Sequence, residues 1–122
     1  MGKSFYDLEV WRIGFDLLKK IYKISENFPK FEQYALGSQL IRSANSIIAN
    51  IAEAHGRYYY LDKIRVLYTS RAEIQETRSH LRVAFGQSYI DELTLKKLDA
   101  EYESLTRKLN MFISYLSNQS KS

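Results

Sequence analysis

Residues 39–57 read QLIRSANSIIANIAEAHGR, and this stretch decides the fold. In a helix with about 3.6 residues per turn, its apolar side chains share one face. These are Leu40, Ala44, Ile47, Ile48 and Ile51. A narrow polar stripe lies on the other side and consists of Arg42, Ser46, Asn50, Glu53 and Arg57. The pattern predicts a helix that packs against other helices, and by itself it indicates no chemical activity.

Helix boundaries are easy to place because the chain has only one proline and five glycines. Its length of 122 residues predicts a single domain, residues 1–122. We predict helices over about residues 5–27, 34–55, 60–85 and 91–117. The last carries a regular apolar seam of Leu98, Tyr102, Leu105, Leu109, Phe112 and Leu116. No alternating β-branched run indicates a strand, so we expect an all-α fold, an antiparallel up-down-up-down four-helix bundle.

The first predicted helix is apolar over about half its circumference, more than one core-facing stripe requires. One stripe contains Leu8, Trp11, Phe15, Leu18 and Tyr22, and a second contains Val10, Leu17, Ile21 and Ile24. Two interpretations of the additional surface remain open. It packs under the loop at residues 28–31 of the same chain, or it contacts another copy of the protein. We take the second stripe as the candidate oligomer interface.

Composition excludes several classes of protein. The chain has no cysteine, so disulfides and thiolate metal sites are ruled out. Its two histidines, His55 and His80, do not stand in the Glu-x-x-His spacing of di-iron bundles. Glycine-rich phosphate loops and Gly-x-Ser-x-Gly elbows are missing from the sequence. We therefore expect no catalytic residues, no metal and no cofactor. No apolar signal segment or membrane span is visible, so we expect a cytoplasmic protein.

The polar stripe of residues 39–57 admits two main interpretations. It is a solvated helix face with ordinary ion pairs, or it is buried between helices. In the second case Arg42, Ser46, Asn50 and Glu53 would satisfy one another and set the helix register. A binding groove is a third, weaker interpretation.

The third predicted helix carries the best candidate for partner binding. The net charge of +4 permits contact with nucleic acid without requiring it. Arginines on one ridge with a nearby tyrosine suit phosphate contacts and base stacking. The candidate RNA- or DNA-binding residues are Arg57, Lys63, Tyr68, Arg71, Gln75, Arg78 and Arg82. The alternative is that these arginines are solvated, or paired with acids such as Glu101 and Glu103 of a neighbouring helix.

Motifs spread over nearly the whole chain resemble a known family. They are Phe5-x-Asp7-Leu8-x-Val10-Trp11, Phe28-Pro29-x-x-Glu32-x-Tyr34-x-Leu36, Gln39-Leu40-x-Arg42-Ser43-Ala44-x-Ser46-Ile47-x-Ala49-Asn50-Ile51-Ala52-Glu53, Gly56-Arg57, Glu76-Thr77 and Tyr89-Ile90. The chain resembles the bacterial 23S rRNA-intervening-sequence proteins, also called S23 ribosomal proteins. The accessory variability protein of diversity-generating retroelements looks like a relative. Tyr59-Tyr60-Leu61-Asp62-Lys63 departs from the family's usual Ser-x-x-Glu-Phe pattern, so the start of the third helix lacks the cap and the core aromatic that the resemblance implies.

The resemblance implies a four-helix bundle that assembles as a homopentamer and has no established enzymatic activity. It also implies nucleic-acid binding through a basic surface, as in the retroelement relative. We therefore expect a non-enzymatic oligomer that binds RNA or DNA. The alternative is a structural or protein–protein interaction module with no nucleic-acid ligand.

Overall fold

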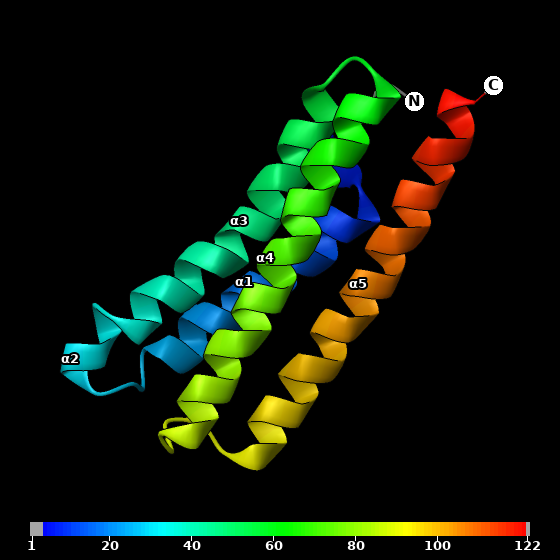
Figure 1. Cartoon of the computed structure of the whole chain (residues 1–122). Helices are drawn as coiled ribbons and strands as arrows, with labels where there is room; N and C mark the ends of the chain where they lie inside the picture. The colour runs from blue at the N-terminus through cyan, green and yellow to red at the C-terminus, as the bar shows by residue number, and fades with distance from the viewer. Residues whose placement is uncertain (1–3, 122) are drawn as a thin grey trace.

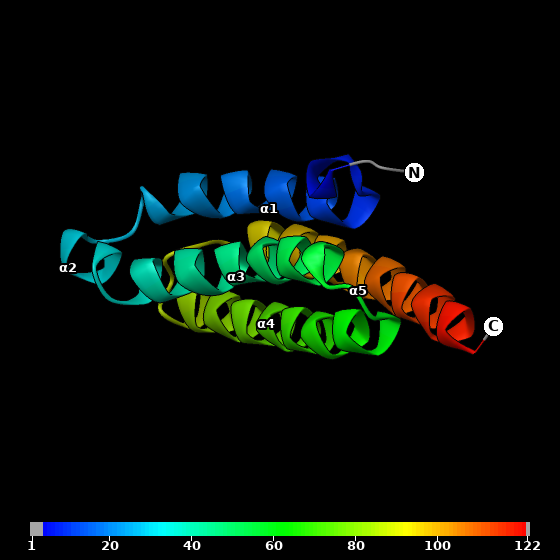
Figure 2. The same ribbon diagram turned by 90° about the horizontal axis from the view of Figure 1, so that it is seen from above.

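Helices account for nearly all of the residues that the computed structural model describes, 4–121. The elements are a 3-10 turn η1 (Phe5–Asp7) and the helices α1 (Glu9–Ser25), α2 (Lys30–Gln33), α3 (Leu36–Gly56), α4 (Tyr60–Gly86) and α5 (Glu92–Ser120). The four long helices run alternately up and down, and each packs against the next along the chain (Figure 1). Seen from above, α1 and α4 lie on opposite sides of α3 (Figure 2). The predicted all-α, antiparallel four-helix bundle is confirmed.

Helix boundaries differ from the predicted ones at both ends of the first helix, at the start of the second and at the end of the fourth. The first helix ends at Ser25 instead of residue 27, and the fourth continues to Ser120 instead of ending at residue 117. The first helix does not begin at residue 5, because Leu8 adopts an extended conformation (φ −71°, ψ 134°) between η1 and α1. Asp7 accepts a hydrogen bond from the Ser4 backbone N–H at 3.2 Å, so this capping box closes the short turn instead. The second long helix begins at Leu36, because the short helix α2 and the irregular residue Ala35 (φ −116°, ψ −94°) precede it.

The start of α5 and the core agree with the sequence pattern. Asp91 caps α5 by accepting a hydrogen bond from the Thr94 backbone N–H at 2.8 Å. The apolar face of α3 is buried as predicted, from Leu40 to Ile51. The seam of α5 is also buried, except that Ile113 takes the core position expected for Phe112, which is half-buried.

The inward face of α1 is not the one expected from the two apolar stripes. Val10, Leu17 and Ile21 were the outward candidates, yet all three lie in the core of their own protomer. The cause is Gly14, which shares their face and lies against Ile48 of α3. A Cβ at residue 14 would come within 2.4 Å of Ile48 Cγ2, so only glycine allows this close approach. The assignment of these three residues to an oligomer interface is therefore wrong.

The remaining apolar residues of α1 lie on its two flanks. Ile24, the fourth member of the proposed interface, is only half-buried. On the other flank, Phe15 and Tyr22 are 40% and 51% exposed, and Trp11 is half-buried. The Trp11 and Phe15 rings stack with centroids 5.2 Å apart. The exposed apolar surface of α1 thus comes from Phe15 and Tyr22 of the stripe that was expected to face the core, whereas Leu18 of the same stripe is buried.

The seam between α1 and α5 is the loosest in the bundle. The two helices touch far less than the other neighbouring pairs do. Ion pairs bridge them, with Lys20 Nζ 2.7 Å from Glu101 Oε2 and Lys108 Nζ 3.4 Å from Glu9 Oε2. A groove of about 480 Å³ remains along the seam.

Candidate nucleic-acid interface

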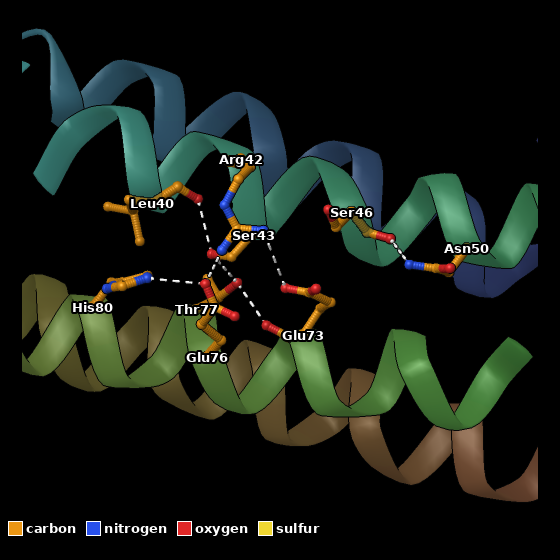
Figure 3. Close-up of polar contacts among 9 residues, drawn as sticks. All are labelled: Leu40, Arg42, Ser43, Ser46, Asn50, Glu73, Glu76, Thr77 and His80. Atoms are coloured by element: carbon orange, nitrogen blue, oxygen red, sulfur yellow. Dashed lines mark hydrogen bonds and ion pairs between the residues drawn. The ribbon is translucent and has the colours of Figure 1, made fainter. Parts of the chain in front are cut away.

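The polar stripe of α3 reaches α4 through one residue, Arg42 (Figure 3). Its guanidinium group forms an ion pair with Glu76 and lies 3.8 Å from Glu73 Oε1. His80 Nε2 lies 3.3 Å from the same Glu76 carboxylate. Burial, the largest cause, and repulsion from the Arg42 charge lower the pKa of His80, while the Glu73 carboxylate acts in the opposite direction.

The other members of the stripe stay within α3. Asn50 Nδ2 donates a hydrogen bond to the Ser46 carbonyl oxygen at 2.8 Å, as Figure 3 shows. Glu53 pairs with Arg57 one turn further along the same helix. Within residues 4–121, Arg42 is therefore the only member of this stripe whose contacts with α4 could set the register.

Buried hydroxyl groups join α3 to α4, and the sequence analysis did not identify them. Ser43 Oγ and Thr77 Oγ1 lie 2.8 Å apart (Figure 3), and Ser70 Oγ donates to the Ile47 carbonyl oxygen at 2.7 Å. All three hydroxyl residues are fully buried. The available signal was the position of Ser43, which stands at core spacing between Leu40 and Ile47 on the apolar face.

Arg78, on the predicted ridge of α4, is neutralised by α5. Its Nε lies 2.7 Å from Asp99 Oδ1 and its Nη2 lies 3.1 Å from Asp99 Oδ2, a bidentate pair. Glu103 lies 3.2 Å from the same guanidinium group. The hydrogen bonds from Arg78 lower the pKa of Asp99. The expected pairing with a neighbouring acid thus holds for Arg78 and Glu103, whereas Glu101 pairs with Lys20 of α1.

Arg71, two turns before Arg78, has neutral partners. Its Nη1 donates to Asn110 Oδ1 of α5 at 2.8 Å, and its guanidinium carbon lies 4.8 Å from the centre of the Tyr68 ring. Neither partner carries a negative charge, so Arg71 is held in place while it keeps its full positive charge.

Two exposed arginines lie on the same side of the bundle as Arg71. Arg82 extends the line of Tyr68, Arg71 and Gln75 along α4 and is exposed. Arg107 is also exposed, one turn from Asn110 on α5. Because the antiparallel helices bring Asn110 to Arg71, Arg107 lies close to the level of Gln75. We call Tyr68, Arg71, Gln75, Arg82 and Arg107 the arginine face. Sequence analysis missed Arg107, since only the pairing of α4 with α5 places it there.

The two remaining candidates, Arg57 and Lys63, organise the turn between α3 and α4. Arg57 is paired with Glu53. Lys63 Nζ donates to the carbonyl oxygens of Ala54 at 3.3 Å and His55 at 2.9 Å, and so caps the end of α3. Partial burial lowers the pKa of the Lys63 ammonium group. These cations therefore have structural partners. Within residues 4–121, Arg82 and Arg107 form no ion pair, although the Arg82 charge helps to lower the pKa of Asp99.

Residues 4–121 contain neither a candidate metal-binding cluster nor a helix that could span a membrane. Within residues 4–121, histidine, aspartate and glutamate side chains form no cluster of three suited to a metal ion. In the same residues, every helix is too short or too polar to span a bilayer.

Comparison with known proteins identifies the family. The model of the 23S rRNA-intervening sequence protein family matches residues 6–111, and the chain belongs to this family. A crystal structure from Bacteroides thetaiotaomicron, of a protein with unknown function from the S23 ribosomal protein family, has a similar fold. The TM-score is 0.79 at 22% sequence identity, covering 86% of this chain and 95% of that chain. A comparison with curated protein sequences found no match.

Proposed function

We propose that this protein is a non-enzymatic, self-associating module that binds the phosphate backbone of RNA or DNA through the arginine face. The observation that carries the proposal is the environment of Arg71. Asn110 and Tyr68 fix its position without neutralising it. By contrast, Arg78 on the same helix is neutralised by Asp99.

The dimensions of the arginine face suit a polyanion. Eleven residues of α4 separate Arg71 from Arg82, about 16 Å at a rise of about 1.5 Å per residue. One strand of a duplex presents about five phosphates over that length, at about 3.4 Å each. Arg107 adds a third cation from α5. Asp99 and Glu103 are the nearby acids, and Arg78 pairs with both.

Salt-dependent binding tests the proposal. Fluorescence anisotropy of labelled 20-nucleotide RNA and DNA would be measured for the wild type and an Arg71→Ala/Arg82→Ala/Arg107→Ala variant. The variant should bind more weakly. The slope of its logarithmic binding constant against the logarithm of salt concentration should be shallower by about one for each phosphate that it no longer neutralises. An Arg12→Ala/Lys19→Ala/Lys23→Ala variant removes the same charge from α1 and should bind like the wild type. Equal weakening of both variants would show that overall charge, not the arginine face, attracts nucleic acid.

A second candidate function, self-association, is favoured by the exposed aromatic flank of α1. Trp11, Phe15 and Tyr22 form a surface of the kind that other protein chains cover. We propose that copies associate through this flank, with five subunits as the number that the resemblance implies. A ring would repeat the arginine face and raise the avidity for a long nucleic acid. Light scattering should give a pentamer for the wild type and a smaller mass for Phe15→Glu/Tyr22→Glu with unchanged helical circular dichroism. A monomeric wild type would contradict the proposal.

A further inference from the structure

Three consecutive tyrosines lie at the turn between α3 and α4. We call Tyr58, Tyr59 and Tyr60, the last being the first residue of α4, the tyrosine turn. Tyr58 is 86% exposed and Tyr59 is 66% exposed, while Tyr60 is 41% exposed. The Tyr58 and Tyr59 rings meet edge to face, with centroids 4.9 Å apart and planes at 89°. This arrangement covers at most one face of one ring. Rings this exposed gain little stability from burial and remain open to a ligand.

The tyrosine turn continues the arginine face. Tyr59 and Arg65 line a shallow depression of about 410 Å³ together with Ser120 at the end of α5. Further along the same side of α4, Arg71 reaches Asn110 of α5. The depression and the hydrogen bond from Arg71 to Asn110 both lie between α4 and α5, so Tyr59 stands at one end of the line of cations. About 18 Å of α4 separates Tyr59 from Arg71 at the usual helical rise.

The ligand chemistry follows from this combination of rings and cations. In a duplex the base faces are covered by their neighbours in the stack, so exposed rings gain nothing from them. In a single strand the bases are free to stack on aromatic side chains while cations hold the backbone. We infer that the tyrosine turn stacks the bases of single-stranded nucleic acid whose phosphates lie along the arginine face. The inference rests on the proposed function and names its ligand class.

The chain offers matched variants for a test. Tyr58→Ala/Tyr59→Ala removes both rings, and Tyr58→Phe/Tyr59→Phe keeps them while removing the hydroxyls. Tyr34, 84% exposed, lies beside α2 at the other end of the bundle, and Tyr34→Ala is the control (Figure 1). All of these side chains are exposed, so the variants should fold. Circular dichroism and light scattering check the fold and the mass.

Anisotropy would compare a labelled 20-nucleotide thymidine strand with a 20-base-pair duplex at the same low salt. The wild type should bind the single strand at least tenfold more tightly than it binds the duplex. The double alanine variant should lose about tenfold or more toward the single strand and stay within twofold for the duplex. The phenylalanine variant and Tyr34→Ala should bind like the wild type.

The remaining outcomes separate this inference from the proposed function. If the alanine variant weakens both ligands equally, or neither, the stacking role is overturned while the arginine variant still reports on backbone binding. If wild type binds neither ligand, the proposed function fails and the inference fails with it. If the alanine variant instead changes the mass in light scattering, the tyrosines serve protein contacts, which also overturns the inference.

Discussion

Ser43 Oγ and Thr77 Oγ1 lie 2.8 Å apart inside the apolar seam between α3 and α4. Each hydroxyl also has a carbonyl acceptor within reach in its own helix, that of Leu40 at 3.2 Å and that of Glu73 at 2.9 Å. Since each hydroxyl has one proton, one of them donates across the seam while the other donates to its own carbonyl. A polar pair in such a place costs little because every hydroxyl stays hydrogen-bonded. It is most favourable at one alignment of the helices, whereas apolar contacts alone tolerate several.

The hydroxyl pair should therefore contribute modestly and cooperatively to stability. Ser43→Ala and Thr77→Val should each lower the free energy of unfolding by about 1 kcal/mol. The double variant should lose less than the sum, because the shared hydrogen bond is removed only once. Urea denaturation measures all three values. Ser46→Ala, which removes a half-buried hydroxyl from the same helix, should stay within about 0.5 kcal/mol of the wild type. Strict additivity would mean that the two hydroxyls are not coupled.

Gly14 and Gly86 should respond in opposite directions to the same substitution. Alanine favours a helix interior over glycine by up to about 1 kcal/mol. At residue 86 a Cβ meets nothing within 4 Å, so Gly86→Ala should be neutral or stabilising. At residue 14 a Cβ would collide with Ile48, and Gly14→Ala should destabilise by about 1–3 kcal/mol. Thermal unfolding of the two variants provides the comparison, and an unaffected Gly14→Ala would contradict the close packing of α1 on α3.

Arg42 and Asn50 share the polar stripe of α3, but only Arg42 has partners on α4. Arg42→Leu removes the ion pair with Glu76 and the cation nearest to the largely buried Glu73, so a loss of up to about 1 kcal/mol is expected. Asn50→Leu removes only a bond to the Ser46 carbonyl oxygen of its own helix, and stability should change by less than about 0.5 kcal/mol. Chemical denaturation of each variant measures these changes in stability. A larger loss of stability for Asn50→Leu than predicted would support the proposed role of Asn50 in setting the helix register.

His80 should make stability depend on pH just below neutrality. Its folded pKa lies below the ordinary value of 6.5 because of burial and the nearby Arg42 charge. The unfolded chain therefore takes up a proton first as pH falls through about 6.5, and the folded state loses stability until its own pKa is reached. Between pH 7.5 and 5.5, the wild type should lose more stability than His80→Gln. The two proteins differ only at residue 80, so the comparison isolates this side chain. Thermal unfolding at several pH values measures this loss. An equal loss in the two proteins would show that the fold does not disfavour the charged form of His80.

The periodicity of apolar residues predicted the architecture because burial depends on spacing along a helix. It succeeded for α3, where Leu40 and Ile51 bracket a single unambiguous face. It failed for α1, which has two apolar faces. The residue that determines which face is buried, Gly14, has no side chain and so adds nothing to an apolar pattern. The break at Leu8 was equally hidden, since its extended backbone leaves no mark in the apolar pattern.

The candidate site was predictable along α4 but not across it. The line from Tyr68 to Arg82 follows from the spacing within one helix. The charge that remains there depends on α5, which neutralises Arg78 through Asp99 and leaves Arg71 with Asn110. Such pairings require the alignment of two antiparallel helices, and a single sequence does not specify that alignment. Arg107 joined the site for the same reason.

The one-sided attachment of α1 has a consequence for the way the molecule opens. This helix rests firmly on α3 and only lightly on α5, where ion pairs replace apolar packing. The local opening with the lowest free energy is therefore the detachment of α1, while α3, α4 and α5 remain packed together. Amide protons of α1 should exchange with deuterium earlier than those in the centres of α3 and α4. Such an opening would expose the apolar surface beneath α1 to a neighbouring molecule without global unfolding.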